Sequence, residues 1–387
     1  MGPRLALLLL LFACSCSHRP SAATGTDASP PSPAILDGSA DSSAVTSRSE
    51  PCPSDGTCSS ACPCGERRDC KDGRCASAAG WRIEELALGG AVTACARYAN
   101  GKVLCAGTEP NYLGRGEKPA KSSLVPDEVV ALDDARRLVA GTLHTCALSG
   151  KSTVSCWGLG GSGETGTGAF GVEPVPAVLA SLVDVTAIAS RSSHTCAVRK
   201  SGAVACWGWN LGGQLGDGTR TNRATPLPVK GVTDAKDVAV GLFHSCAIRR
   251  GGGVTCWGRA GGANGVAAPV AGVGAVDELV ATDHDTCVRT GGTVTCWGAK
   301  RGKPAPLPDV MDATRLAAGN SEVCVLRQAG TVTCFDLVDD KRRELTLAGR
   351  PVDARLVTMG SDWACFVGKD ERVHCPGHPL QSAFEQL

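Results

Sequence analysis

The segment His194-Thr-Cys-Ala-Val-Arg-Lys-Ser-Gly-Ala-Val-Ala-Cys-Trp-Gly208 decides the fold, because the chain repeats its outline seven times. In each copy a second cysteine follows the first by nine or ten residues, across a short break that contains glycine. The first cysteines are 51, 50, 50, 41, 37 and 41 residues apart, which is the period of blade-like repeats. The pairs are Cys95 with Cys105, Cys146 with Cys156, Cys196 with Cys206, Cys246 with Cys256, Cys287 with Cys296, Cys324 with Cys334, and Cys365 with Cys375.

Each copy contains about four short β segments separated by turn signals. An apolar run ends near Ala-Gly, as at 137–141. The strand with the first cysteine, the Cys-Trp-Gly strand and a Pro/Val segment such as 225–229 follow. No stretch shows sustained helical periodicity, so residues 81–387 are predicted to form an all-β domain.

The spacing of the cysteines predicts a disulfide across each hairpin. If Cys246 lies opposite Cys256, then Ile248 faces Val254 and the turn falls on residues 249–253. Residues in a non-hydrogen-bonded antiparallel pair have Cα atoms about 4.5 Å apart, which a disulfide can bridge. The shorter fifth copy fits the same register, because its Gly291-Gly292 forms a two-residue turn.

Alternation along the strands places a small and a large side chain together on the opposite face of each hairpin. Ala247 and Trp257 are diagonal neighbours there, and the later copies have Val288 with Trp297 and Val325 with Phe335. Each blade is therefore expected to present an aromatic side chain to its neighbour, in sheets that stack about 10 Å apart.

The third copy continues as Cys206-Trp-Gly-Trp-Asn-Leu-Gly-Gly-Gln-Leu-Gly-Asp-Gly-Thr219 and resembles the RCC1 repeat, whose seven copies form a seven-bladed β-propeller. The resemblance covers residues 81–375 and is strongest over 135–260. The loop after Trp297 is short, and Pro376 stands where tryptophan is expected. Family members include a nucleotide exchange factor on chromatin, bacterial propellers that cover enzyme active sites, and many surface proteins. The resemblance carries over no functional residue.

The amino terminus predicts export. A short basic start precedes an apolar run at 5–13, which is too short to span a bilayer and fits a secretory signal. Leu11-Phe-Ala-Cys14 resembles a bacterial lipobox, so Cys14 is predicted to be lipidated and residues 1–16 to be the lipoprotein signal. Cys16 is a second candidate, and an ordinary cleaved signal is the alternative. Ser15 carries no inner-membrane retention signal, so the resemblance places the chain on the outer membrane or cell surface.

Two further segments precede the repeats. Residues 17–50 are rich in Ser, Ala, Pro and Thr, cannot bury a core, and are predicted to be a disordered tether of roughly 30 Å. Residues 51–78 form a cysteine-rich module that is too small for a hydrophobic core. Three disulfides are favoured over zinc because paired C-x2-C knuckles are absent. The module contains Cys52, Cys58, Cys62, Cys64, Cys70 and Cys75.

Composition limits the partners. Fourteen of the 22 cysteines form the seven regular pairs, which indicate an oxidising compartment. The 39 basic and 38 acidic side chains give a net charge of +1 without a basic block, so nucleic acid is not an expected partner.

No catalytic, cofactor-binding or metal-binding residue is predicted. Four histidines, His144, His194, His244 and His284, suggest a metal site. However, equivalent positions on adjacent blades lie about 10 Å apart, so the histidines are expected to hydrogen-bond neighbouring loops.

Positions that depart from the repeat are the better candidates for interaction. They are Tyr112, Trp209, Asn210, Asp283, His284 and Asp285. Aromatic residues on loops of a rigid scaffold are typical interface anchors. The sequence therefore predicts a non-catalytic propeller that binds a protein or other envelope macromolecule through its loop face. A purely structural envelope protein is one alternative, and a lyase or glycosidase with its site in the axial channel is another.

Overall fold

The computed structural model describes residues 68–71, 74–77, 80–90, 93–116, 124–260, 265–378 and 381. The predicted signal with Cys14, the tether at 17–50, and Cys52, Cys58, Cys62 and Cys64 lie outside the described residues. One hairpin of the module is described, β1 (Arg68–Lys71) with β2 (Arg74–Ser77), and its backbone register places Cys70 opposite Cys75. Within the described part of the chain, no helix has the length and apolar character needed to cross a membrane.

The repeats fold into antiparallel sheets whose strands run in chain order from the axis outwards, here named A to D. Blade 1 consists of β3 (Ile83–Gly89), β4 (Thr93–Tyr98), β5 (Val103–Gly107) and β6 (Asp127–Glu128). Blade 2 consists of β7 (Ala135–Ala140), β8 (His144–Ser149), β9 (Val154–Gly160) and β10 (Gly171–Val178). Blade 3 consists of β11 (Val185–Arg191), β12 (His194–Arg199), β13 (Val204–Gly208) and β14 (Arg223–Pro228).

The remaining blades follow the same order, and the last has three strands. Blade 4 consists of β15 (Ala235–Val240), β16 (His244–Arg249), β17 (Val254–Gly258) and β18 (Ala268–Pro269). Blade 5 consists of β19 (Glu278–Ala281), β20 (Asp285–Thr290), β21 (Thr293–Gly298) and β22 (Gly302–Pro306). Blade 6 consists of β23 (Ala313–Ala318), β24 (Glu322–Arg327), β25 (Val332–Asp336) and β26 (Arg342–Glu344). Blade 7 consists of β29 (Ala354–Met359), β30 (Ala364–Gly368) and β31 (Val373–His374).

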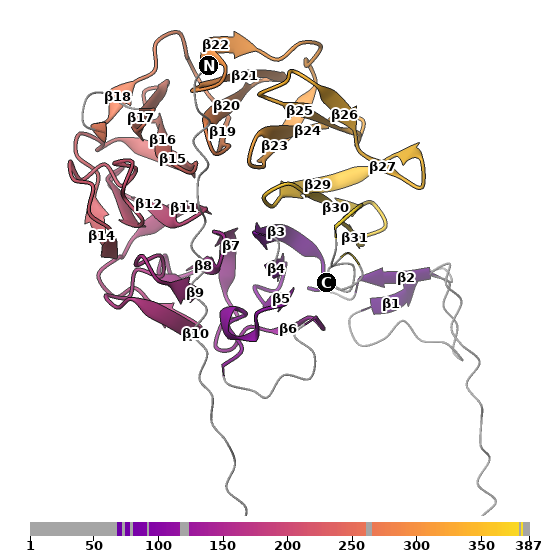
Figure 1. Cartoon of the computed structure of the whole chain (residues 1–387). Coiled ribbons are helices and arrows are strands. Elements are labelled where there is room, and N and C mark those ends of the chain that lie inside the picture. Colours follow the sequence, from indigo (N-terminus) through magenta and orange to yellow (C-terminus); the bar gives the residue numbers. More distant parts are fainter. Residues whose placement is uncertain are drawn as a thin grey trace, which may run out of the picture. The chain divides into compact units, whose positions relative to one another are not determined.

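The seven blades close into a ring. Each inner strand contacts the inner strand of the next blade, and β29 of blade 7 contacts β3 of blade 1 (Figure 1). Outside the blades lie a small hairpin, β27 (Thr346–Leu347) with β28 (Arg350–Pro351), and the 3-10 turn η1 (Pro110–Tyr112). The predicted all-β, seven-bladed propeller is confirmed.

The cysteine pairs form the predicted disulfides. In blade 4 the register pairs Cys246 with Cys256 and Ile248 with Val254, and in blade 5 Thr290 faces Thr293 across the two glycines. The bridged Cα atoms are 3.9–4.3 Å apart in all seven repeats. Disulfides and hairpin register therefore specify the same pairing of strands.

All fourteen repeat cysteines are bonded as the spacing predicts, one disulfide to each blade. In blades 1 to 4 the bonds join Cys95 with Cys105, Cys146 with Cys156, Cys196 with Cys206, and Cys246 with Cys256. In blades 5 to 7 they join Cys287 with Cys296, Cys324 with Cys334, and Cys365 with Cys375. Each of these cysteines is therefore a structural residue, and none offers a free thiol.

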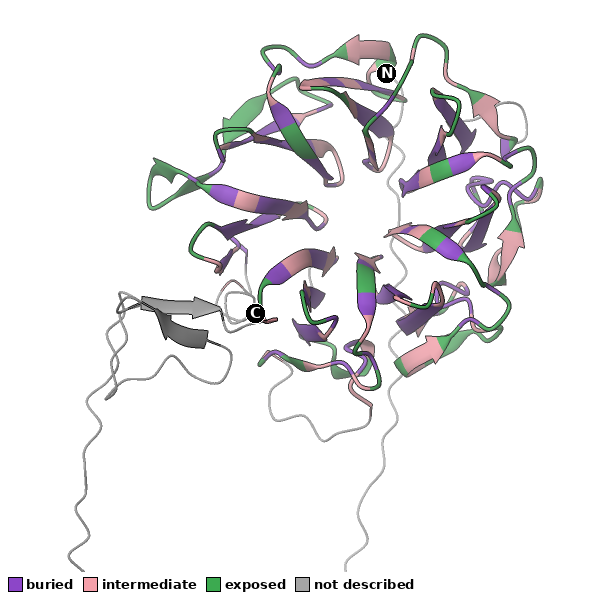
Figure 2. Ribbon diagram, turned by 180° about the vertical axis from the view of Figure 1, so that it is seen from behind, coloured by how far each residue is buried: buried purple, intermediate pink, exposed green. Residues whose placement is uncertain are grey.

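The hydrophobic cores lie between blades. The disulfide between Cys196 and Cys206 of blade 3 packs with Ala247 and Trp257 of blade 4, and the other regular interfaces repeat this arrangement. Figure 2 shows buried residues on the middle strands and exposed ones at the outer strands and turns. Trp257 also donates its indole N–H to the carbonyl of Gln214 in the preceding blade, at 2.8 Å. The tryptophan therefore fastens one blade to the previous one.

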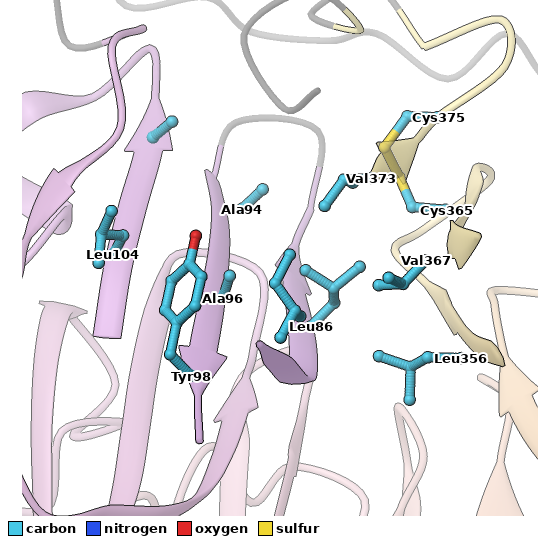
Figure 3. Packing of buried hydrophobic residues seen from close by; sticks show 12 residues of the cluster. Leu86, Ala94, Ala96, Tyr98, Leu104, Leu356, Cys365, Val367, Val373 and Cys375 are labelled. Carbon is cyan, nitrogen blue, oxygen red and sulfur yellow. A yellow bond between two sulfur atoms is a disulfide. The ribbon is translucent and has the colours of Figure 1, made fainter. Parts of the chain in front are cut away.

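The interface that closes the ring is built differently. Blade 1 has Ala106 at the tryptophan position, and Tyr98 and Trp81, with ring centroids 5.1 Å apart, contribute the aromatic surface instead. These residues pack with Leu356, Val367 and the disulfide of blade 7. Figure 3 labels Tyr98 and these blade 7 residues in the cluster. In blade 7 itself Phe366 is the buried aromatic residue, which compensates for Pro376 at the position where tryptophan was expected.

Candidate functional site

The alternation of strand directions gives the ring two faces. The turns between strands A and B and the loops between strands C and D lie on one face, which we call the top face. The turns between strands B and C and the links to the next blade lie on the other, the bottom face. Trp209, Asn210, Asp283 and His284 all belong to top-face loops or turns, and so does Tyr112 on η1.

The repeated histidines connect neighbouring blades. Nε2 of His194 lies 2.8 Å from Oγ of Ser245 in the next blade, and His144 and His244 contact Thr195 and Thr286 in the same way, at 2.9 Å. All three imidazoles are buried. The expected structural role is therefore observed, although the partner is a strand hydroxyl and not a loop.

Burial also sets the charge of these histidines. It lowers the pKa of His144 and of His244 to about 4, and that of His194 to about 3. The imidazoles are consequently neutral at physiological pH.

His284 does not occupy the same repeat position as the other three histidines, so the prediction that all four are equivalent is wrong for His284. In blade 5 Asp285 pairs with Gly298 as His244 pairs with Gly258, so Asp285 occupies the repeated position. Asp285 is buried, and its carboxylate accepts the backbone N–H groups of Lys300 and Arg301 at 3.0 and 3.3 Å. Asp285 thus stabilises the turn between β21 and β22 of its own blade, while His284 is displaced towards the surface.

His284 belongs to a half-buried aromatic cluster on blades 3 to 5. Its ring stacks on the ring of Phe243, with the two ring centroids 6.1 Å apart. The Phe243 ring also contacts the Trp209 ring, with a centroid distance of 5.3 Å. The exposed Arg259 guanidinium lies over the Phe243 ring at 3.9 Å, a cation–π geometry. We call Trp209, Phe243, Arg259 and His284 the aromatic ledge. Leu211 lies two residues after Trp209 and is 57% exposed.

A rigid loop supports the ledge. Asn210 is fully buried, and its amide donates to Asp217 and to the carbonyl of Thr221 while its oxygen accepts the N–H of Leu215. Gln214 of the same loop donates to the carbonyl of Leu242, the residue before Phe243. The residues next to Trp209 and Phe243, Asn210 and Leu242, are therefore fixed by hydrogen bonds of this loop.

The structure thus divides the predicted interaction residues. Trp209 and His284, from loops separated in sequence, meet through Phe243, and Asp283 lies beside His284. Asn210 and Asp285 are buried structural residues, and Tyr112 is half-buried on η1, which packs against β9 and β10 of blade 2. Sequence reasoning missed Phe243 and Arg259. One signal was available in the sequence: of the three regular repeats, only the one in blade 4 has phenylalanine at the A–B turn.

A cavity of about 410 Å³ occupies the axial channel between the inner strands. At its top end the Arg191 side chain reaches from blade 3 across to blades 5 and 6. It donates to the carbonyl of Ala318 at 2.8 Å and to Asn320 at 3.3 Å, and pairs with Asp283 at 3.4 Å. Burial raises the pKa of Asp283, and the charge of Arg191 opposes that rise. The sequence signal for Arg191 was Ser190-Arg191, where the neighbouring repeats have glycine at the second position, in Ala140-Gly141 and Val240-Gly241.

Four further carboxylates line the channel: Glu84, which pairs with Arg82 at 3.5 Å, and three others that are each held by a neighbouring group. Glu85 accepts the N–H of Leu138 at 2.6 Å and pairs with Arg97 and Arg137 at 3.3 Å. Glu278 pairs with Arg289 at 3.1 Å, and Asp237 accepts the N–H of Val238 at 2.9 Å. Burial raises the pKa of all three.

Potential metal ligands converge at one place in the described residues. Glu322 lies beside Cys324 and Cys334, but a disulfide occupies both sulfur atoms. Glu322 itself makes a two-point ion pair with Arg343, with both distances 2.7 Å. This group is therefore explained without an ion.

Comparison with known proteins agrees with this architecture. The family model for the Regulator of chromosome condensation (RCC1) repeat matches residues 201–248, and a second model of the same repeat matches residues 185–214 and 235–264. These matches lie in blades 3 and 4, and together with the seven-bladed propeller they confirm the predicted resemblance to the RCC1 repeat. No curated protein matches the sequence.

Several solved structures share the fold. Human WBSCR16 is 19% identical, with a TM-score of 0.64, over 75% of this chain and 88% of that chain. Yeast RCC1 (Prp20) bound to Kap60 is 16% identical, with a TM-score of 0.62, and the match covers 73% of this chain and 79% of that chain. Prp20p from Saccharomyces cerevisiae is 19% identical, with a TM-score of 0.58, and the match covers 71% of this chain and 80% of that chain. That structure is described together with the binding of Prp20p to Gsp1p and histones. At these identities the likeness establishes the fold alone.

Proposed function

We propose that this protein is an exported, lipid-anchored propeller that binds a protein partner through its top face and catalyses no reaction. The observation that carries the proposal is the aromatic ledge. Aromatic and arginine side chains that are half-buried on rigid loops are typical anchors of protein interfaces. Because disulfides fix the hairpins beneath them, little conformational entropy is lost when a partner binds.

Export is supported by the seven disulfides of the ring, which cytosolic reductants would keep open. The apolar run at 5–13 and the lipobox-like Cys14 supply a route to the envelope, and residues 17–50 supply a tether. Replacing Cys14 by Ala should release the chain from the membrane fraction, as cell fractionation would show. Membrane retention of the Cys14→Ala chain would contradict lipid anchoring.

If the protein were an enzyme, its active site would lie in the axial channel, because a cavity that contains carboxylates of raised pKa suits acid–base chemistry. We favour a structural role because each carboxylate already binds a backbone N–H or an arginine of the blades. An enzyme would instead need one of these groups free to meet substrate.

Site-specific photo-cross-linking in the native envelope tests the proposed binding. A photoreactive residue at Leu211 should give one discrete protein adduct, and Trp209→Ala should abolish it. The matched control is Met311, which is 77% exposed in a bottom-face link and should give no such adduct. Equal labelling from both positions would contradict a top-face site, and no adduct from either would favour the purely structural envelope protein.

A further inference from the structure

Two exposed guanidiniums flank the apolar surface of the ledge. Arg259 lies over the outer side of Phe243. Arg220 reaches back along its own loop and donates to the carbonyl of Leu211 at 3.2 Å. Trp209 and Leu211 belong to the same loop as Arg220, so apolar side chains and cationic groups share this part of the top face.

Neither of these arginines has an acidic partner among the described residues, and the carboxylates nearby are already engaged. Asp217 binds Arg223 at 3.0 Å and the N–H of Thr219 at 2.9 Å. Asp283 binds Arg191, and Asp285 binds two backbone N–H groups. The ledge therefore presents positive charge that the protein itself does not neutralise.

The adjoining part of the top face, on blades 6 and 7, is acidic. Blades 6 and 7 border a second cavity, of about 340 Å³, whose lining includes Glu322, Asp336 and Asp362. Arg343 is the one basic side chain in that lining, and Glu322 already binds it. A basic partner would consequently be attracted away from the ledge.

We propose that the ledge recognises an acidic protein segment in which an aromatic or large aliphatic residue is flanked by Asp or Glu. The apolar residue would cover Trp209 and Leu211, while the carboxylates would form two-point hydrogen bonds with Arg220 and Arg259. This inference rests on the proposed function, because it names the chemistry of the partner at the same site.

Selection from a random 12-residue peptide library on the intact, disulfide-bonded full-length protein tests the inference. Enriched peptides should carry Asp or Glu beside an aromatic or aliphatic residue. Their binding, measured by fluorescence anisotropy, should weaken at least about tenfold in the double variant that combines Arg220→Glu with Arg259→Glu, and should weaken in the wild type as salt rises. Peptides with Lys in place of the acids should bind that variant better than they bind the wild type.

The control is Lys200→Glu, an exposed bottom-face residue of blade 3, which should leave the affinity within about twofold. Thermal melting of each variant checks that the propeller is intact. Enrichment of neutral or basic peptides, failure to enrich any peptide, or equal binding to the charge-reversed variant would overturn the inference. If the Leu211 adduct persists in that variant, only the acidic chemistry fails; if the wild type gives no adduct, the proposed function fails.

Discussion

Blades 2 to 4 and blades 5 to 7 share one backbone plan but differ at the position two residues before the first cysteine. Blades 2 to 4 carry His144, His194 and His244 there, each bonded to a hydroxyl of the next blade. Blades 5 to 7 carry Asp285, Glu322 and Trp363. Asp285 stabilises a loop, Glu322 pairs with Arg343, and Trp363 packs on His378 at 4.9 Å.

The comparison separates architecture from recognition. Where the repeat is regular, the buried histidines bind hydroxyl groups of the next blade. Where it departs, side chains move to the surface, as His284 does when Asp285 takes the buried position. The aromatic ledge lies at the boundary between the two regions, with Trp209 and Phe243 from regular blades and His284 from the first irregular one.

The largest expected effect concerns two tryptophans separated by one residue in blade 3. Trp207→Ala removes a fully buried side chain from the interface with blade 2 and should cost about 3–5 kcal/mol of stability. Trp209→Ala removes a half-buried ledge residue and should cost less than about 1 kcal/mol while abolishing partner binding. Thermal or urea unfolding compares them, and similar losses would show that the ledge is part of the core.

Removing one disulfide should lower the free energy of unfolding by the same amount in blades 2 to 4 as in blades 5 to 7. Replacing Cys196 and Cys206 of blade 3 by alanine, or Cys324 and Cys334 of blade 6, opens a loop of about eleven residues, which is worth up to about 3 kcal/mol. Unfolding under non-reducing conditions measures both losses. A much smaller loss in blade 6 would mean that the irregular blades depend on other contacts.

Acid should destabilise the regular blades selectively. Because burial lowers the pKa of His194 to about 3, the unfolded chain binds the proton more readily, and stability is lost as pH falls below about 6.5. One such histidine accounts for about 1.5 kcal/mol between about pH 6.5 and about pH 5. Urea unfolding at the two pH values should show a smaller acid loss in His194→Gln than in wild type.

Protonation of the channel carboxylates acts in the other direction. Their raised pKa means that the folded protein binds protons more readily than the unfolded chain, so acid adds stability as the pH falls through the folded pKa. If His194→Gln and wild type lost the same stability in acid, the buried histidines would not be the source of the acid sensitivity.

The smallest effect is expected for the conservative change Asp285→Asn. Asp285→Asn keeps an oxygen that can accept the N–H groups of Lys300 and Arg301 and should cost less than about 1 kcal/mol, whereas Asp285→Ala should cost about 1–2 kcal/mol. Unfolding measurements decide between them. Equal losses would indicate that the negative charge, and not the acceptor, stabilises the blade 5 loop.

Much of the fold was predictable because its rules are local. Cysteine spacing and the Gly291-Gly292 turn fixed the hairpin register, and alternation placed Trp257 on the face towards its neighbour. Phe243 and Arg259 were not predictable, because their importance comes from contacts with side chains on other blades. The same reason explains why the sequence does not show that Asn210 and Asp285, two of the predicted interaction residues, are buried.

Sequence alone determined the repeated hairpin, its disulfide and the number of blades, since these depend on separations of nine or ten residues and on a period of 37 to 51. Tertiary structure alone decided which loops meet. Ring closure brings residues 209, 243 and 284 to one surface and carries Arg191 across the axis to Asn320. Such contacts depend on the rotation from blade to blade, which no local spacing records.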